Sequence, residues 1–119
     1  MAERLTAVAI ALVALATAAV ATADRRATHS ERRAIANAIE LPTKCTKARI
    51  STVDDRWAAA SWKPRPKDKC MPYASNGVVV LKHKVNRWRI VTEGSSFGCA
   101  YLYRHVPRAV AQDLRIDCY

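Results

Sequence analysis

Four basic side chains lie close together in one short stretch of this sequence and are its strongest candidates for binding chemistry. They are Lys82, Lys84, Arg87 and Arg89, within the stretch GVVVLKHKVNRWRIVTE at 77–93. Like charges that face each other across a sheet are destabilising. Either solvent and salt screen them, as on an ordinary hydrated outer face, or an anionic group binds among them.

A serine motif could in principle supply nucleophilic chemistry. The segment 94–98 reads GSSFG and matches the G-x-S-x-G pattern, with Ser96 at the nucleophile position. That motif needs a helix straight after the serine and a large sheet that also carries a histidine and an acid. Here a cysteine follows and the chain is short, so we predict a turn and no catalysis.

The other candidate catalytic or metal-binding residues form no recognisable site. The histidines are His29, His83 and His105, and none of them belongs to a metal-ligand motif. No pattern pairs two acids for glycoside hydrolysis, and no glycine-rich phosphate loop is present. We therefore predict no enzyme activity, no metal and no cofactor, and we expect His83 to pack against Trp88.

Four cysteines are spaced widely along the chain, at Cys45, Cys70, Cys99 and Cys118. An even number in a small exported domain is typical of disulfides, whereas a zinc site would require closely spaced pairs. Four cysteines allow three connectivities. We predict Cys45–Cys70 and Cys99–Cys118, the second of which ties the C-terminal segment to the end of the central hairpin.

The basic cluster lies on a predicted β-hairpin, Gly77–Glu93. Its strands are Val78–Lys84 and Arg87–Glu93, both rich in residues that favour strands. A turn at Val85–Asn86 places His83 opposite Trp88 and Leu81 opposite Ile90. Because valine is a poor residue for a tight turn, a turn at Asn86–Arg87, which keeps the same faces, is the alternative. Alternation predicts a core face with Val79, Leu81, His83, Trp88, Ile90 and Thr92. The four cations and Val80 then lie on the outer face.

Two further elements precede this hairpin. Thr28 and Glu31 form a capping box, which predicts a helix from Thr28 to about Glu40, before Pro42, after a basic and frayed start at 24–27. A second hairpin is predicted from Cys45–Val53, a turn at Asp54-Asp55, and Arg56–Lys63. Its tryptophans, Trp57 and Trp62, fall on opposite faces, so one enters the core and the other borders a rim or groove.

The remaining segments are a loop and a C-terminal tail. Prolines and cations alternate in Lys63–Pro72, which predicts an extended loop. Ala100–His105 is predicted as a last short strand. Pro107 suits the first position (N1) of a final short helix that packs through Val110 and Leu114.

The N-terminal stretch predicts export. Residues 5–23 carry no charge and end in the small-residue site Ala21-Thr22-Ala23, as in a secretory signal peptide of residues 1–23. An uncleaved membrane anchor of marginal length is the alternative; after cleavage we expect no stable membrane span. The chain of 119 residues has a formal net charge of +10, so an exported form would meet anionic partners such as wall polymers, lipid surfaces or acidic proteins. Few aromatics and export argue against nucleic acid.

The stretch 45–118 resembles small uncharacterised secreted proteins of high-GC actinobacteria. The likeness rests on ISTVD with Trp57-Ala58, GVVVL, WRIV with Gly94-Ser95, and the spaced cysteines. These motifs are structural, so the resemblance implies no particular activity. The order of a helix and then an antiparallel sheet is also similar to cystatin-like and nuclear-transport-factor-like α+β folds, which is a likeness of fold alone.

These observations predict one α+β domain. It has an N-terminal helix within 24–44, a curved antiparallel sheet of about four strands in two hairpins, a short C-terminal helix and two disulfides within 45–119. The first functional hypothesis is a secreted, non-enzymatic binding protein that uses Lys82, Lys84, Arg87 and Arg89, helped by the Lys63–Lys69 loop, on an anionic partner. The alternative is an inhibitor or interaction module that inserts a disulfide-pinned loop, Lys63–Pro72 or Gly94–Cys99, into a partner protein.

Overall fold

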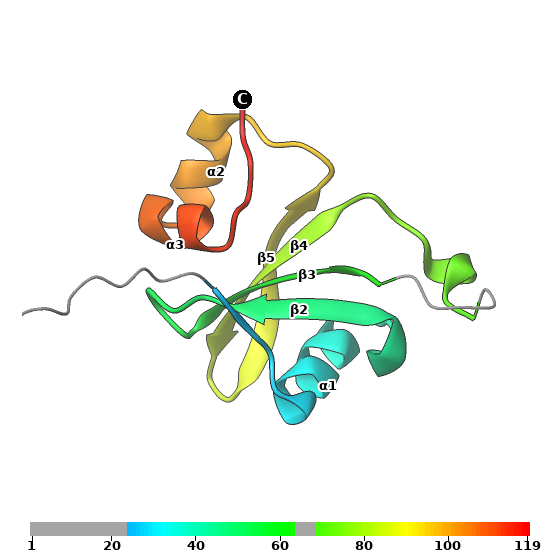
Figure 1. The fold of residues 1–119 in the computed structure, drawn as a ribbon. Coiled ribbons are helices and arrows are strands. Elements are labelled where there is room, and N and C mark those ends of the chain that lie inside the picture. The colour runs from blue at the N-terminus through cyan, green and yellow to red at the C-terminus, as the bar shows by residue number, and fades with distance from the viewer. Residues whose placement is uncertain (1–23, 64–68) are drawn as a thin grey trace, which may run out of the picture.

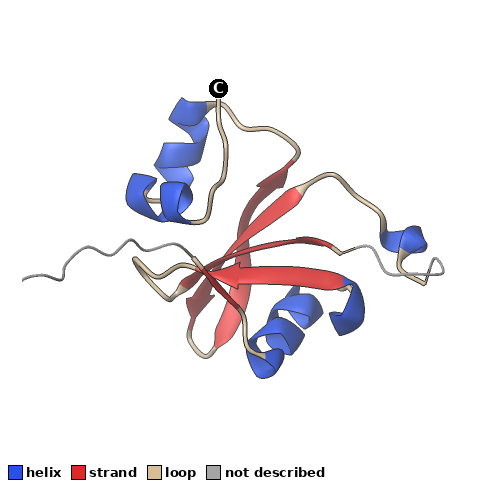
Figure 2. Cartoon of the chain, viewed as in Figure 1, coloured by secondary structure: helices blue, strands red, loops and turns tan. Residues whose placement is uncertain are grey.

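The computed structural model describes residues 24–63 and 69–119. The described chain is α+β, with a five-stranded antiparallel sheet and three α-helices (Figures 1 and 2). The predicted fold class is therefore confirmed, with one more strand than the four expected. The predicted signal peptide, residues 1–23, lies outside the described residues, and so do residues 64–68 of the predicted loop. Among the helices of the described residues, none has the length and apolar character needed to cross a membrane.

The strands follow one another across the sheet in the order of the sequence. They are β1 (Arg25–Arg26), β2 (Thr46–Ile50), β3 (Trp57–Trp62), β4 (Val78–Lys84) and β5 (Arg87–Gly94). Every neighbouring pair is antiparallel. The prediction of a frayed start at 24–27 is wrong, because Arg25 and Arg26 pair with Ile50 and Arg49 as β1.

The helix α1 (His29–Ala38) begins as its sequence predicts. Thr28 is the N-cap and accepts a hydrogen bond from the Glu31 amide, while the Glu31 carboxylate accepts one from the Thr28 amide. This reciprocal box satisfies two amides that a helix start would otherwise leave unpaired. The helix ends two residues before the predicted Glu40.

The sheet buries apolar side chains on both faces. On one face, α1 packs over it through Ile35, which forms a core with five sheet residues, Ala48, Ile50, Ala58, Ala60 and Leu81. On the other face, α2 (Cys99–His105) and α3 (Arg108–Asp113) cover Trp57, Ala59 and Val80. Figure 1 shows α1 on one side of the sheet and α2 with α3 on the other. The expectation that Val80 faces outward is therefore wrong, because the C-terminal helices bury it completely.

The segment predicted as a last strand is helical. Residues 99–105 form α2, whose buried residue is Leu102. Leu102, Val106, Val110 and Leu114 are all buried and recur every four residues. A four-residue recurrence suits helices and their connection better than a strand, in which alternate residues share a face. Pro107 is the N-cap of α3 and not its first residue, while Val110 and Leu114 pack as predicted.

Both predicted disulfides are confirmed. Cys45 joins Cys70, and Cys99 joins Cys118. The first links the start of β2 to the segment before β4, and the second holds the end of the chain against the start of α2. The Phe97 carbonyl also accepts from the Tyr119 amide, and the Cys99 amide donates to the Tyr119 carbonyl.

Candidate functional site

The central hairpin places the four predicted cations as two opposed pairs. Lys82 faces Arg89, and Lys84 faces Arg87, across β4 and β5. The turn lies at Val85 and Asn86, which both have positive φ, 51° and 63°. This register confirms the predicted pairings of His83 with Trp88 and of Leu81 with Ile90. We call Lys82, Lys84, Arg87 and Arg89 the hairpin cationic surface.

Most of this charge is not neutralised by the described part of the chain. Lys84, Arg87 and Arg89 are exposed and make no ion pair with described residues. Lys82 is half-buried, with its ammonium 5.1 Å from the centre of the Trp57 ring. Such a contact orients a cation without cancelling its charge.

Asp54 interacts electrostatically with Lys82 of this surface, and it is already paired with Arg56. The Arg56 guanidinium donates to the Asp54 carboxylate at 2.8 Å and 3.0 Å. These bonds lower the pKa of Asp54 below its ordinary value, and the charge of Lys82 acts in the same direction. Asp54 therefore leaves the positive character of the hairpin largely intact.

In the C-terminal part of β5, the side chains lie on other faces of the sheet than predicted, because the pairing of β4 with β5 contains a register shift. After Leu81–Ile90, the next pairs are Val80–Thr92 and Val79–Glu93, so Val91 is an extra residue. A bulge of this kind moves every later side chain to the other face. Thr92 accordingly contacts the Tyr101 hydroxyl of α2 at 2.9 Å, and its predicted place beside Trp88 and Ile90 is wrong.

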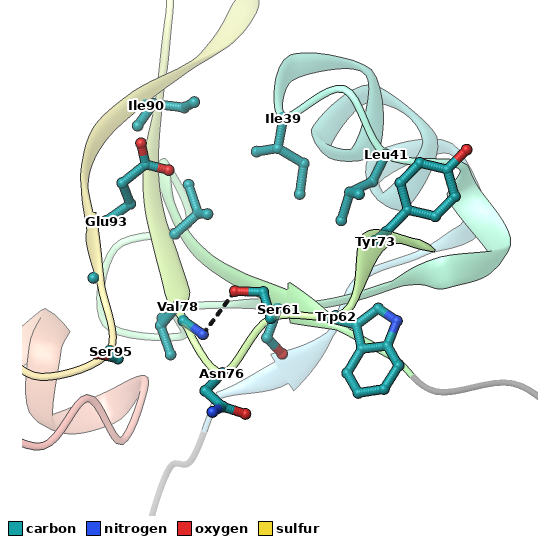
Figure 3. A pocket seen from close by; sticks show the side chains of 14 residues that line it. Ile39, Leu41, Ser61, Trp62, Tyr73, Asn76, Val78, Ile90, Glu93 and Ser95 are labelled. Atoms are coloured by element: carbon teal, nitrogen blue, oxygen red, sulfur yellow. Dashed lines mark hydrogen bonds between the residues drawn. The ribbon is translucent and has the colours of Figure 1, made fainter. Parts of the chain in front are cut away.

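The bulge also helps to build a cavity of about 580 Å³, which lies between the end of α1, the end of β3, the start of β4 and the end of β5. Figure 3 shows Ile39 and Leu41 extending toward the sheet, Glu93 and Ile90 on the opposite wall, and Trp62 and Tyr73 at one side. Trp62 thus borders a groove, as predicted, while Trp57 is the buried tryptophan. Ile90, predicted as core, is 45% exposed on this cavity wall.

The chemistry of this cavity does not match an anionic partner. Its described lining includes one carboxylate, Glu93, several hydroxyl and amide groups, and no basic side chain. The anion-binding hypothesis therefore depends on the hairpin cationic surface and not on this cavity. The sequence did not predict that Glu93 lies on the cavity wall, because a bulge within a run of strand-forming residues has no clear sequence signal.

The remaining candidates form no catalytic arrangement within the described residues. His83 packs against Trp88, with ring centres 5.0 Å apart, as predicted. His105 Nδ1 lies 2.9 Å from the Tyr101 carbonyl oxygen. Ser96 is exposed and makes no hydrogen bond to the described residues. Those residues also contain no group of three histidine, cysteine or acidic side chains placed to hold a metal.

The loop Gly94–Cys99 offers little to a partner protein. Phe97 is buried in the core beneath α2 and α3, and backbone hydrogen bonds join Phe97 and Cys99 to Tyr119. Ser95 and Ser96 are the exposed side chains. The other predicted loop, Lys63–Pro72, includes residues 64–68, outside the described part of the chain.

Comparison with protein-family models, curated proteins and solved structures finds no match to this chain. The resemblances to secreted actinobacterial proteins and to cystatin-like folds stay predictions. The function must therefore be argued from the geometry alone.

Proposed function

We propose that this protein is a non-enzymatic, exported binding protein for an anionic extracellular polymer. The observation that carries the proposal is the two opposed pairs of cations, Lys82–Arg89 and Lys84–Arg87. Lys84, Arg87 and Arg89 are exposed and form no ion pair with the described residues. Repulsion within such pairs destabilises a sheet. A bound polyanion would relieve this repulsion, and the relief would add to the free energy of binding.

A polymer suits this surface better than a bilayer or a folded acidic protein. The cations lie on an open strand surface, so successive charges of a chain-like anion can contact them in turn. Val85, 81% exposed at the hairpin tip, is the apolar side chain between the cations of the turn, and one valine is a weak anchor for a bilayer. Lipid and protein partners therefore serve as comparison arms in the test.

Export is part of the proposal. Two disulfides fit an oxidising extracellular environment, and the sequence at 5–23 has the character of a secretory signal. Proteins outside a bacterial cell meet walls rich in phosphate and carboxylate groups, for which a basic protein has long-range attraction.

The first prediction concerns three exposed cations. We expect Lys84→Gln, Arg87→Gln and Arg89→Gln together to weaken binding to an anionic wall polymer by roughly ten- to hundredfold, at about 0.5–1 kcal/mol per exposed contact. Lys82 is left in place because its contact with Trp57 adds packing. The measurement is binding of oxidised protein, residues 24–119, to purified wall preparations over a salt series. Wild-type binding should fall steeply with salt.

A charge-matched variant provides the control. Arg33→Gln, Arg104→Gln and Arg115→Gln also remove three exposed cations, from α1, α2 and the segment after α3. If both triple variants lose the same affinity, only net charge matters and the hairpin cationic surface is not the site. Tight, salt-tolerant binding to a protein would instead favour the inhibitor or interaction-module hypothesis. Stronger binding to anionic vesicles than to wall polymer would move the partner to lipid.

A further inference from the structure

A second set of cations surrounds a pocket at the β1–β2 edge of the sheet. The hairpin cationic surface, by contrast, lies on β4 and β5 at the other end of the strand order. This edge pocket has a volume of about 470 Å³. Its basic lining residues are Arg26, Arg32, Lys47, Arg49 and Lys63.

Backbone pairing brings these residues together from distant parts of the sequence. Arg26 of β1 is the register partner of Arg49 on β2. The Ala27 amide donates to the Ala48 carbonyl at 3.1 Å, so α1 and its residue Arg32 begin beside β2. The Lys63 amide donates to the Cys45 carbonyl at 2.8 Å, which places Lys63 beside the start of the same strand. Sequence reasoning did not find this group because it did not predict β1.

The described acids near this pocket leave most of its charge unbalanced. Asp24 binds Arg49 through two hydrogen bonds, and Glu31 binds Arg25, outside the pocket. The described lining contains no carboxylate. Arg26, Arg32, Lys47 and Lys63 have no ion pair with the described residues.

Arg32, one of the residues that line the pocket, has a donor without a partner in the described part of the chain. The Nε of Arg32 is buried from solvent and has no hydrogen-bond acceptor among the described residues. Buried donors are normally paired, and a group left unpaired points to an acceptor that the described residues do not supply. A guanidinium presents Nε and a terminal nitrogen as a fork that matches two oxygens of a phosphate.

We propose that the edge pocket binds a multiply charged phosphate-type oxyanion, such as pyrophosphate or a phosphate monoester. Several cations without counter-charge among the described residues favour a ligand with more than one negative charge. The Arg32 guanidinium would bind the oxygens of that ligand once its side chain turns Nε toward the pocket. The volume exceeds the space needed by one phosphate group and admits a second phosphate or an attached organic group. This site is separate from the hairpin cationic surface and does not depend on the polymer hypothesis.

The test is calorimetric titration of the oxidised protein, residues 24–119, with inorganic pyrophosphate at fixed ionic strength. We expect one saturable site per chain. Arg32→Gln should weaken binding by roughly tenfold or more, because it removes a charged donor fork. The matched control is Arg33→Gln, the next residue of α1, which is exposed and outside the pocket; its affinity should stay within about twofold of wild type.

A second variant and a second readout guard against a folding artefact. Lys63→Gln lies outside α1 and should also weaken pyrophosphate binding. Pyrophosphate should raise the melting temperature of the wild type and of Arg33→Gln, but raise that of Arg32→Gln much less, because a ligand stabilises the state that it binds. No saturable binding at millimolar pyrophosphate, or equal losses in Arg32→Gln and Arg33→Gln, would overturn the proposal.

Two further ligands identify the source of the phosphate, and a hairpin variant distinguishes the edge pocket from the hairpin cationic surface. Binding of glycerol phosphate that Arg32→Gln abolishes would support a free ester. Binding of phosphatidate vesicles with the same sensitivity would support a lipid headgroup. The triple variant Lys84→Gln, Arg87→Gln, Arg89→Gln should keep pyrophosphate binding. If that variant loses it while Arg32→Gln keeps it, the anion binds at the hairpin and the edge pocket is not the site.

Discussion

At the scale of single residues, some charges in this protein are paired and others are not. Glu31 is paired with Arg25, whereas the cations of the hairpin cationic surface form no ion pair with the described residues. Arg25 donates to both carboxylate oxygens of Glu31, at 2.8 Å and 2.9 Å, and this contact is the main reason that the pKa of Glu31 falls from 4.5 to about 2. The amide of Thr28 contributes as well. Glu31 therefore couples β1 to the start of α1 through one carboxylate.

A pH dependence follows from this lowered pKa. The unfolded chain binds a proton at Glu31 near its ordinary pKa, whereas the folded chain resists protonation to about pH 2. The stabilisation by the Glu31 carboxylate is thus present above about pH 4.5 and is lost as the pH falls toward 2. We expect Glu31→Gln to lower the free energy of unfolding by about 1 kcal/mol at pH 7.

The check is urea unfolding of wild type and Glu31→Gln at pH 7, 4 and 2. The difference between them should shrink toward zero at the lowest pH. Glu40→Gln is the control, since Glu40 is exposed and makes no ion pair with the described residues. A gap that stays constant from pH 7 to pH 2 would show that the amide group disturbs the capping box and that charge is not involved.

At the scale of elements, a buried polar contact attaches α3 to the loop between β2 and β3. The Asp113 carboxylate accepts from the Ser51 hydroxyl at 3.0 Å and from the Thr52 amide at 2.7 Å. Ser51 is fully buried, and its oxygen also accepts from the Val53 and Asp54 amides. Asp113 therefore orients a loop that leads into Asp54 and Trp57, beneath the hairpin cationic surface.

We expect Asp113→Ala to destabilise the fold by about 2–3 kcal/mol, because it leaves a buried hydroxyl without its charged acceptor. Denaturant unfolding measures the effect. Asp117→Ala, at an exposed position with no hydrogen bond to the described residues, should change stability by less than about 0.5 kcal/mol. Equal effects from the two variants would mean that the contact with Ser51 carries no stability of its own.

Local sequence signals predicted some elements and missed others for identifiable reasons. Thr28 and Glu31 specify the start of α1 by their own side chains, and Val85–Asn86 sets the hairpin register through spacing alone. The strand β1 was missed because two arginines carry no strand signal, and their partners lie on β2, far along the chain. The helix α2 was missed because Tyr101, Tyr103 and His105 suggest alternation, whereas the four-residue recurrence from Leu102 to Leu114 predicts helices.

The candidate sites divide in the same way. Lys82, Lys84, Arg87 and Arg89 could be grouped from the sequence, since all four belong to one hairpin. The edge pocket could not, because Arg32 and Lys63 meet only after β1 and β2 pair and α1 docks. The position of Glu93 on the cavity wall depends on one extra residue in β5, which only the folded ladder reveals.

For the whole molecule, one sheet separates two cores that are closed in different ways. Helix α1 closes the first core beside Ile35 and Leu81. The segment 97–118 closes the second, with Phe97, Leu102 and Val106 inside and the Cys99–Cys118 bridge across its ends. The bridge constrains a short loop, so its largest effect should fall on α2 and α3.

We expect replacement of Cys99 and Cys118 by alanine to cost about 3 kcal/mol, the chain-entropy value for a loop of this size. Thermal unfolding measures the loss. Hydrogen exchange should then show faster exchange in α2 and α3 than in β3 and β4, because the second core opens before the sheet does. Uniformly faster exchange across all elements would show that the two cores unfold as one unit.

The pairing of the cysteines has a consequence for the biogenesis of the chain. Each bridge joins cysteines that are consecutive in the sequence, Cys45 to Cys70 and Cys99 to Cys118, so neither loop encloses another cysteine. If the chain enters an oxidising compartment with its N-terminal end first, Cys45 meets its correct partner before Cys99 emerges. Oxidation in order of appearance therefore produces the native pairing directly, without slow exchange between mispaired bridges.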